Sequence, residues 1–254
     1  MKKIILLLSA AVFLISCSNV GKGEFLITGT AKGIDNGKTI ILETQDANGL
    51  GLIALDTVKV ENGKFEFKGK ITEPSFHTLQ LESANGKVLL ILEDGQEVTI
   101  AIDKDSIQKS KVSGTYNNDE YVKFTKDLEV MQKKLVDFQK KNADIMTSAQ
   151  QTQDTVVINK LMKEFAKIQE AVSTDSKKKY FGYAETHPKA FISALIVQGM
   201  MNDPAVDMKK IESLYKGLDE TLKATKPGKA IKTRLEQSKM PAAATPPPSV
   251  GASN

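Results

Sequence analysis

The sequence has 254 residues, of which 41% are hydrophobic and 26% are charged, and its formal net charge is +4. This composition is typical of a globular chain with one sizeable core or two smaller ones, and the charge is too small and dispersed to indicate nucleic-acid binding. The single cysteine excludes an intrachain disulfide, a CxxC dithiol and a metal site made of several thiolates.

The N-terminus has the features of an export signal. Two lysines precede an apolar run over residues 4–15, which is shorter than the roughly 20 residues of a membrane-spanning helix. Residues 14–17, Leu-Ile-Ser-Cys, resemble the bacterial lipobox, in which the cysteine receives a diacylglyceryl thioether and the signal is cleaved before it. We therefore expect residues 1–16 to be a lipoprotein signal peptide and Cys17 to be the lipid attachment site. The alternative is an ordinary signal peptide followed by a chance cysteine.

Lipidation would decide two further properties of the chain. Two or three acyl chains form a stable membrane anchor, since each buried CH₂ contributes about 0.8 kcal/mol. The lipid would also use the thiol of Cys17, so the mature chain would carry no thiol–disulfide chemistry of its own.

Residues 17–24 are small and polar, as in a short tether, and residues 25–115 follow a strand-like pattern. Short alternating runs are separated by Asn-Gly or Asp-Gly pairs at residues 62–63, 85–86 and 94–95. Asn-Gly is preferred in two-residue hairpin turns because both positions need a positive φ. In DTVKVENGKFEFKG we expect the strand with Val58 and Val60 to pair, through this turn, with the strand of Phe65 and Phe67. The region is predicted to be an antiparallel β-sandwich or barrel.

The period changes at Tyr116, and residues 116–239 are predicted to be helical. Asn117 and Asn118 are expected to be N-caps. Apolar residues then recur at steps of three and four in two stretches, joined by a polar segment from Asn142 to Gln153. This pattern predicts an antiparallel helical hairpin with coiled-coil packing. The first stripe is Tyr121, Phe124, Leu128, Met131, Leu135 and Phe138, and the second is Ile158, Leu161, Phe165, Ile168 and Val172.

Shorter helices are expected after the hairpin. Pro188 ends the second long helix, and FISALIVQGMM should form a short buried segment. Two more helices are predicted near Asp207 and at Pro227, a residue suited to the first helical position. Residues 240–254 are rich in Pro and Ala and are expected to be disordered. The predicted fold class is α+β, with an N-terminal antiparallel β domain followed by the helical hairpin and short helices.

The two histidines do not indicate a metal site. His77 lies in a strand-like run and His187 directly precedes Pro188, so neither has a second histidine or a cysteine nearby. A metal site would need carboxylates from distant segments. We expect neither a metal nor a cofactor.

Two acidic pairs also have structural explanations. Asp103 and Asp105 lack the glycine and trailing glutamate of a calcium loop, which favours a turn. Glu93 and Asp94 resemble a pair of catalytic carboxylates, but Asp94 and the following glycine form a turn signature. We therefore expect no catalytic residue.

One basic run and several tyrosines could mark a surface. Residues 177–179 are three lysines, most simply a solvated helix face, with contact to anionic headgroups as the alternative. Tyr116, Tyr121, Tyr180 and Tyr183 could line a binding surface where the helices meet the sheet, although their spacing is explained by core packing.

The lipobox, FLITGTA, VKVENGKFEFKGKITEP, LLILEDGQEVTI and VSGTYNNDEYVKF together resemble the domain of unknown function at the start of many Bacteroidota envelope lipoproteins. In that family the domain commonly precedes a thioredoxin-like domain of the TlpA thiol:disulfide interchange type. TDSKKKYFGYAETHPKAFISALIV and IESLYKGLDETLKATKPGKAIKTRLEQ also resemble the helical connector of those proteins. Where they continue into the domain with CxxC, this sequence reaches its Pro-rich tail. A stand-alone module and a truncated redox lipoprotein are both open interpretations.

The functional expectation is a non-enzymatic, lipid-anchored envelope protein that acts as a scaffold or protein-interaction module. We expect it at the outer membrane, facing the periplasm, with the membrane and an envelope protein as partners and no nucleic acid. The alternative is a truncated or accessory component of a thiol:disulfide interchange system, for which the partner would be a thioredoxin-like redox protein.

Overall fold

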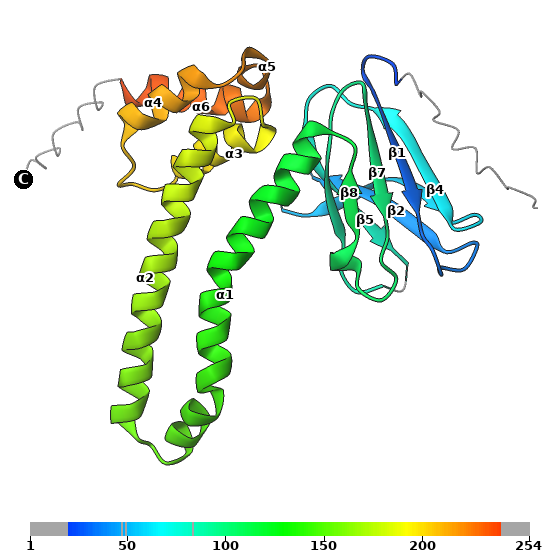
Figure 1. Ribbon diagram of the computed structural model, residues 1–254. Coiled ribbons are helices and arrows are strands. Elements are labelled where there is room, and N and C mark those ends of the chain that lie inside the picture. Colours follow the sequence, from blue (N-terminus) through cyan, green and yellow to red (C-terminus); the bar gives the residue numbers. More distant parts are fainter. Residues whose placement is uncertain (1–19, 47, 49, 83, 240–254) are drawn as a thin grey trace, which may run out of the picture.

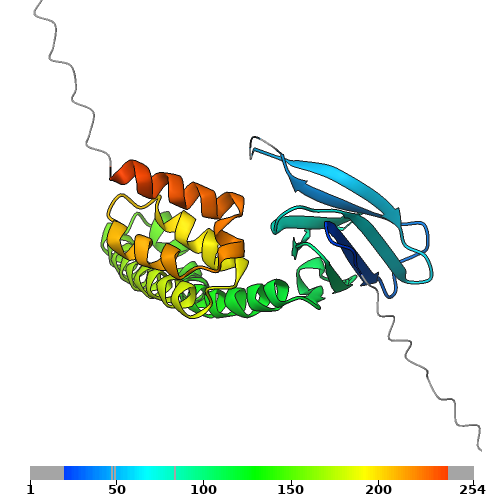
Figure 2. The ribbon, with the colours of Figure 1, turned by 90° about the horizontal axis from the view of Figure 1, so that it is seen from above.

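A computed structural model describes residues 20–239, apart from residues 47, 49 and 83. Cys17, the expected signal peptide and the Pro-rich tail therefore lie outside the described residues. A β-sandwich precedes a helical part, and a long helical hairpin extends away from both the sandwich and a group of short helices (Figure 1). Seen from above, the short helices and the sandwich lie side by side, with the start of the hairpin between them (Figure 2). This arrangement confirms the α+β class.

The strands form two four-stranded sheets. Sheet A has the order β4-β1-β7-β8, and sheet B has the order β3-β2-β5-β6. All neighbouring strands in these two sheets are antiparallel except β1 and β7, which are parallel, so the expected antiparallel sandwich is confirmed apart from this pair. The strands are β1 (Glu24–Thr30), β2 (Thr39–Gln45), β3 (Leu52–Lys59), β4 (Lys64–Lys70), β5 (Ser75–Leu81), β6 (Val88–Leu92), β7 (Gln96–Ala101) and β8 (Lys111–Ser113). A short 3₁₀ helix, η1 (Ile107–Lys109), precedes β8.

Alternation along the strands builds the core between the two sheets. Inward side chains of both sheets form one cluster, which accounts for the period-two pattern of the sequence. On the β1–β4 pair, the ring of Phe65 lies against Gly29, where an added Cβ would come within 1.9 Å of the ring. Core members include Phe25, Ile27, Phe67, Val98 and Ile100 of sheet A, and Ile40, Leu42, Leu79, Leu90 and Leu92 of sheet B.

The predicted hairpin around Asn62 and Gly63 was wrong in its pairing. The turn itself is present, since both residues have positive φ and Glu61 forms a bridge with Lys64. However, β3 pairs with β2 in sheet B, whereas β4 pairs with β1 in sheet A. The backbone of Val60 bonds to the segment before β2, and the carbonyl of Gly63 accepts from the segment after β1, so the chain crosses between the sheets at this turn.

The other two turns differ in whether the strands that they join belong to one sheet or to two. The turn at residues 85–86 joins β5 and β6, which are antiparallel neighbours in sheet B. The turn at residues 94–95 joins β6 to β7 and therefore carries the chain from sheet B to sheet A. Local turn chemistry thus predicted where strands end but not which strands pair.

The two long helices are α1 (Tyr116–Gln151) and α2 (Thr155–Thr186). They pack along the predicted stripes, for example through the rings of Phe138 and Phe165, whose centroids are 5.9 Å apart. The expected connection over 142–153 was wrong, because α1 continues to Gln151. Polar side chains in this stretch bond back to helix carbonyls, as Asn142 does to Phe138. The real turn ends at Asp154, whose carboxylate caps α2.

The short helices are α3 (Phe191–Met200), α4 (Met208–Gly217), α5 (Glu220–Lys223) and α6 (Lys226–Ser238). As predicted, α2 ends just before Pro188, the apolar segment forms a largely buried helix, and α4 begins next to Asp207, which caps it. Pro227 lies at the start of α6. The short helix α5 was not predicted from the sequence. These helices share a second core, which also includes Ile91 from β6.

Candidate functional site

The first turn of α1 joins the sandwich to the helical part. Asn117 and Asn118 were expected to be N-caps, but Thr115 takes that role, with an extended backbone and a hydroxyl that accepts from the N–H of Asn118 at 3.3 Å. Asn118 is buried inside the first turn. Its Oδ1 accepts from the N–H of Ile91 at 2.8 Å, and its Nδ2 donates to the carbonyl of Ile91 at 2.7 Å. The side chain therefore occupies the place that a neighbouring strand would take beside β6.

Asn117 connects the same turn of α1 to α3. We call the contacts of Asn117 and Asn118 with β6 and α3 the joint. Its Nδ2 donates to the carboxylate of Glu93 at 2.7 Å, and its Oδ1 accepts from the N–H of Phe191 at 2.7 Å. That N–H belongs to the first residue of α3, which has no intrahelical partner for it. One turn of α1 thus fixes the position of both β6 and α3.

Aromatic side chains form the apolar part of the same joint. Phe76 lies on the outer face of sheet B, and its ring meets Tyr121 of α1 at 5.1 Å and Phe191 of α3 at 6.2 Å between centroids. Ile91, its cross-strand neighbour, is fully buried against the short helices. The joint is therefore held by packing as well as by hydrogen bonds.

A charged cluster lies where α1 and α2 face each other. Glu120 is buried, and its carboxylate accepts from Lys123 at 2.8 Å and from the hydroxyl of Tyr183 at 3.1 Å. His187 places Nε2 3.4 Å from this carboxylate, and its ring stacks on Tyr183 with centroids 4.2 Å apart.

The cluster favours an ionised carboxylate and a protonated phenol. The hydrogen bond from Lys123 lowers the pKa of Glu120, assisted by the bond from Tyr183. Burial, and then the negative charge of Glu120, raise the pKa of Tyr183 well above its usual value. Tyr183 is thereby held as a hydrogen-bond donor, and the cluster is arranged to hold α1 and α2 together.

A groove of about 840 Å³ lies between sheet B and the short helices. On the sheet side the groove is lined by residues of three strands, including Phe76 of β5, Gln45 of β2 and Leu52 of β3. On the helix side it is lined by residues that include Leu195 of α3. One end is closed by Glu73, which accepts from the backbone N–H of Lys226 at 2.7 Å and pairs with its ammonium group at 3.4 Å. We call this space the interdomain groove.

The edge strand β3 borders the interdomain groove and exposes apolar side chains. Leu52, Ile53 and Leu55 are 46%, 50% and 50% exposed, and the preceding Leu50 is 91% exposed. Leu55 is the extra residue of a β-bulge between the two halves of the β2–β3 pairing. Because β3 ends sheet B, half of its backbone polar groups face away from β2.

The other edges of the sandwich are protected. β4 alternates buried phenylalanines with exposed charges, β8 has only three residues, and β6 is covered at Ile91 by Asn118. The exposed charges of β4 are Lys64, Glu66, Lys68 and Lys70. Both β3 and β4 are long edge strands of the described sandwich. β3 exposes leucine and isoleucine side chains, whereas β4 exposes charged ones.

The structure keeps the two histidines apart. His77 is buried in β5, where Nδ1 donates to the carbonyl of Ser75 at 3.1 Å, and burial lowers the pKa of its imidazole. His187 caps α2 and belongs to the Glu120 cluster. Among the described residues, no group of three or more His, Cys, Asp or Glu side chains could hold a metal ion.

The acidic pairs are parts of turns. Asp103 Oδ1 accepts from the N–H groups of Asp105 and Ser106 at 3.0 and 2.9 Å. Glu93 binds Asn117, whereas Asp94 accepts from the N–H of Gly23, so the two carboxylates serve different segments. Asp103, Glu93 and Asp94 thus accept hydrogen bonds from the turns and the segments beside them.

Two lysines of the basic run are used in ion pairs. Lys177 pairs with Asp203 at 2.7 Å, and Lys179 pairs with Asp127 of α1. Lys177 and Lys178 are exposed and Lys179 is half-buried, so the run lies largely on a solvated face of α2, where two of its lysines also form ion pairs.

Three of the four tyrosines singled out in the sequence pack against phenylalanine rings. Tyr121 meets Phe76, while Tyr180 and Tyr183 meet the buried ring of Phe124 at 5.7 and 4.7 Å. Tyr116 is 51% exposed. Tyr121, Tyr180 and Tyr183 pack against one apolar cluster that contains Phe124, as the core-packing interpretation predicts.

Sequence reasoning missed the β3 edge. A signal is present in GLGLIAL over residues 49–55, an uncharged stretch that contrasts with the charged alternation of β4. None of the helices in the described part of the chain combines the length and apolar character needed to cross a membrane.

The comparisons with known proteins found one family model that matches the sandwich and the start of α1. Residues 25–121 match the family model of a domain of unknown function, DUF4369. The match extends past β8 into α1 and ends just after Asn117 and Asn118, so it includes the turn that binds β6. No curated protein and no solved structure matches the chain.

Proposed function

We propose that the protein is a lipid-anchored, non-catalytic interaction module of the cell envelope that binds an extended segment of a partner protein along β3. The supporting observation is the uncharged, exposed edge from Leu50 to Leu55. An added strand would bond to the outward backbone groups of β3, and its alternate side chains would cover Leu52 or enter the interdomain groove.

Site-specific photocrosslinking in envelope preparations tests this proposal. A photoreactive residue in place of Leu52 should give an adduct with a different protein, whereas the same residue in place of Lys68 on β4 should not. Leu55→Lys, which introduces a charge at an exposed position, should remove the Leu52 adduct without loss of folding. An adduct with a second copy of this chain, or equal adducts from β3 and β4, would contradict the proposal.

Anchoring through Cys17 is the second part of the proposal, and its support is the lipobox-like sequence. We place the protein at the outer membrane with its domains in the periplasm. Cys17→Ser should shift the protein from the membrane fraction to the soluble periplasmic fraction and abolish labelling by an alkyne fatty acid. An equally membrane-bound, labelled variant would overturn this assignment.

We also propose a more specific identity, in which the matched domain is the N-terminal domain of a TlpA-like lipoprotein and the helices after it are the connector of such a protein. The sequence resemblance over α2, α3 and α4–α6 favours it, because it extends beyond the matched residues. In this case β3 would present a substrate to a thioredoxin-like partner. The chain alone should not reduce insulin with dithiothreitol, but should accelerate reduction by an added thioredoxin-like protein. Activity of the chain alone, or no effect of adding it, would contradict this identity.

A further inference from the structure

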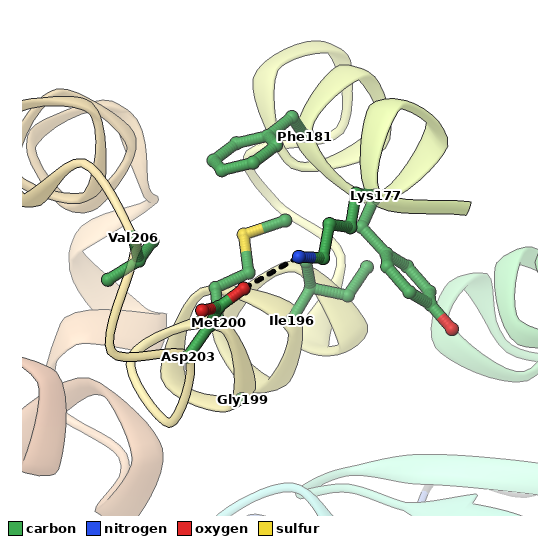
Figure 3. A pocket seen from close by; sticks show the side chains of 8 residues that line it. Lys177, Phe181, Ile196, Gly199, Met200, Asp203 and Val206 are labelled. Carbon is green, nitrogen blue, oxygen red and sulfur yellow. Dashed lines mark hydrogen bonds and ion pairs between the residues drawn. The ribbon is translucent and has the colours of Figure 1, made fainter. Parts of the chain in front are cut away.

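The helical hairpin is covered by α3 only at its base. Leu128 of α1 and Tyr180 of α2 pack against an apolar cluster that includes Ile192 of α3. Just past the end of α3, Asp203 accepts from Lys177 of α2 at 2.7 Å (Figure 3). Beyond these residues the hairpin extends away from both the sandwich and the short helices (Figure 1). Over that length two helices enclose their core alone.

The core of this uncovered part is only partly enclosed. Met131, Leu135 and Phe138 of α1 and Phe165 and Ile168 of α2 are half-buried, although they belong to the predicted stripes. In a helix bundle, the sides of a helix pair that flank its core are covered by further helices. The two open sides of the hairpin are therefore the places where other helices could pack.

The two sides of the hairpin differ in charge. Because α1 and α2 are antiparallel, residues that directly follow a core position lie on one side in both helices, and residues that directly precede one lie on the other. The preceding side is charged, and the ion pair between Lys134 of α1 and Asp175 of α2 crosses it at 3.6 Å. The following side carries no charged residue over 132–150 of α1 and 159–173 of α2, and we call it the uncharged face. Its exposed residues are Gln132, Val136, Gln139, Ala143, Thr147 and Gln150 of α1, and Asn159, Met162, Ala166, Gln169 and Ser173 of α2.

The uncharged face has the character of a helix-packing surface. Val136 and Met162 are 43% and 60% exposed on it. Tyr180 lies about two turns beyond Ser173 on the same side of α2, and there it lines one space with Ile196 of α3. The chain therefore packs a helix on this side at the base of the hairpin and leaves the rest of the side open.

We propose that the uncharged face packs against the same face of a second copy of this chain, with the two hairpins antiparallel and their four helices forming a bundle. A parallel arrangement would bring the α3 helices of both copies together, whereas in an antiparallel one each tip ends beside the α3 of the other copy. The shared length is about 22 residues of each helix, or about 33 Å, and two helices are about 20 Å wide. Each copy would bury roughly 650 Å², and the sum over both copies lies in the lower part of the range for stable interfaces. The contact does not involve β3 and is independent of the function proposed for it.

Ala166 tests the proposal, because it lies near the middle of the uncovered part of α2 and its two copies would face each other across the two-fold axis of the dimer. The Cys17→Ser chain, which can carry neither the thioether lipid nor a thiol, should show a monomer–dimer equilibrium in sedimentation equilibrium. Ala166→Lys should raise the dissociation constant of this dimer by about tenfold or more, because it places two ammonium groups in an uncharged contact.

Ala171→Lys is the matched control. Ala171 is also an exposed alanine of α2, but it directly precedes the core residue Val172 and therefore lies on the charged side. The substitution should leave the dissociation constant within about twofold of that of the Cys17→Ser chain. In the same background, Ala166→Cys should form a disulfide-linked dimer under mild oxidation, whereas Ala171→Cys should not.

Added salt distinguishes packing from attraction between charges. Lys140 and Lys163 border the uncharged face, and neither forms an ion pair within the described part of the chain. Screening by salt should therefore leave the dimer unchanged or strengthen it. Thermal unfolding of each variant shows whether the fold is kept. A Cys17→Ser chain that stays monomeric at about 100 μM, equal weakening by the two folded lysine variants, or a dimer that salt dissociates would overturn the proposal.

Discussion

The side chain of Asn118 forms two hydrogen bonds with the backbone of Ile91, accepting from its N–H at 2.8 Å and donating to its carbonyl at 2.7 Å. An amide side chain from a helix thus pairs with an edge strand as another strand would. The same side chain also donates to its own N-cap, Thr115, at 2.9 Å. The pairing closes the β6 edge of sheet B and fixes α1 to the sandwich, which leaves β3 as the open edge of that sheet.

Asn118→Ala should therefore destabilise the protein strongly. The substitution would leave both backbone groups of the fully buried Ile91 without these partners, and each unsatisfied buried group costs about 1–3 kcal/mol. We expect the free energy of unfolding to fall by roughly 3 kcal/mol, measured by urea denaturation of the mature chain.

Asn142→Ala is the control for Asn118→Ala. Asn142 lies in the C-terminal third of α1, away from the sandwich, and its Nδ2 donates to the carbonyl of Phe138 in the same helix. The free energy of unfolding should change by less than about 0.5 kcal/mol. Similar small effects at both positions would show that Asn118 does not hold the joint.

Substitution of glycine by alanine should change the stability in opposite directions in α6 and in α2. At Gly228 in α6, an added Cβ would lie 2.2 Å from the carbonyl oxygen of Leu222 and 2.6 Å from the Cα of Lys223, both backbone atoms. Gly228→Ala should therefore cost about 1–3 kcal/mol of stability through forced backbone shifts. At Gly182 in α2 the Cβ would meet nothing, so Gly182→Ala should stabilise by about 0.5–1 kcal/mol. Thermal and urea unfolding check both signs, and a stabilised Gly228→Ala would refute the close packing of α5 against α6.

The element types of this fold could be predicted because they depend on local periodicity. Alternation marked the strands, and steps of three and four marked α1 and α2. Pairing could not be predicted, because an Asn-Gly turn has the same local chemistry whether its strands share a sheet or separate. At residues 62–63 the partners of the flanking strands, β2 and β1, are fixed by distant segments.

The joint and the open edge escaped prediction for a related reason. Asn117 and Asn118 have the residue type and position of N-caps, and only the fold brings them to Phe191 and Ile91, 74 and 27 residues away. Leu52 and Ile53 look like core residues in a strand-like run. Their exposure follows from the strand order, which places β3 at an edge.

His77 should make stability depend on pH in the neutral range. Burial lowers the pKa of its imidazole in the folded state below the ordinary value of 6.5. Below pH 6.5 the unfolded chain therefore binds a proton that the folded chain does not, and the free energy of unfolding falls as the pH decreases. His77→Gln should reduce this slope between pH 7 and pH 5, measured by urea denaturation at several pH values. An unchanged slope would show that His77 is protonated equally in both states.

Glu120 should also lower the free energy of unfolding as the pH decreases, but in a lower pH range than His77. The hydrogen bond from Lys123 holds the pKa of Glu120 below its ordinary value of 4.5, so the carboxylate stabilises the fold above that pH and loses the effect as the pH falls through the folded-state pKa. Glu120→Gln should cost roughly 1–3 kcal/mol at pH 6, since charge-assisted bonds to Lys123 and Tyr183 are weakened, and the difference from the wild type should narrow at pH 3.

Two further measurements isolate the Glu120 effect from general acid destabilisation. Glu170→Gln, on the exposed surface of α2, should stay within about 0.5 kcal/mol of the wild type from pH 6 to pH 3. Glu120→Gln should also nearly keep the slope between pH 7 and pH 5, because the Glu120 carboxylate is mostly ionised in both states over that range. A difference between Glu120→Gln and the wild type that stays constant down to pH 3 would mean that the interactions of Glu120 do not depend on its charge. The cluster would then hold α1 and α2 together by packing, chiefly through the ring of Tyr183 in α2 against Phe124 in α1.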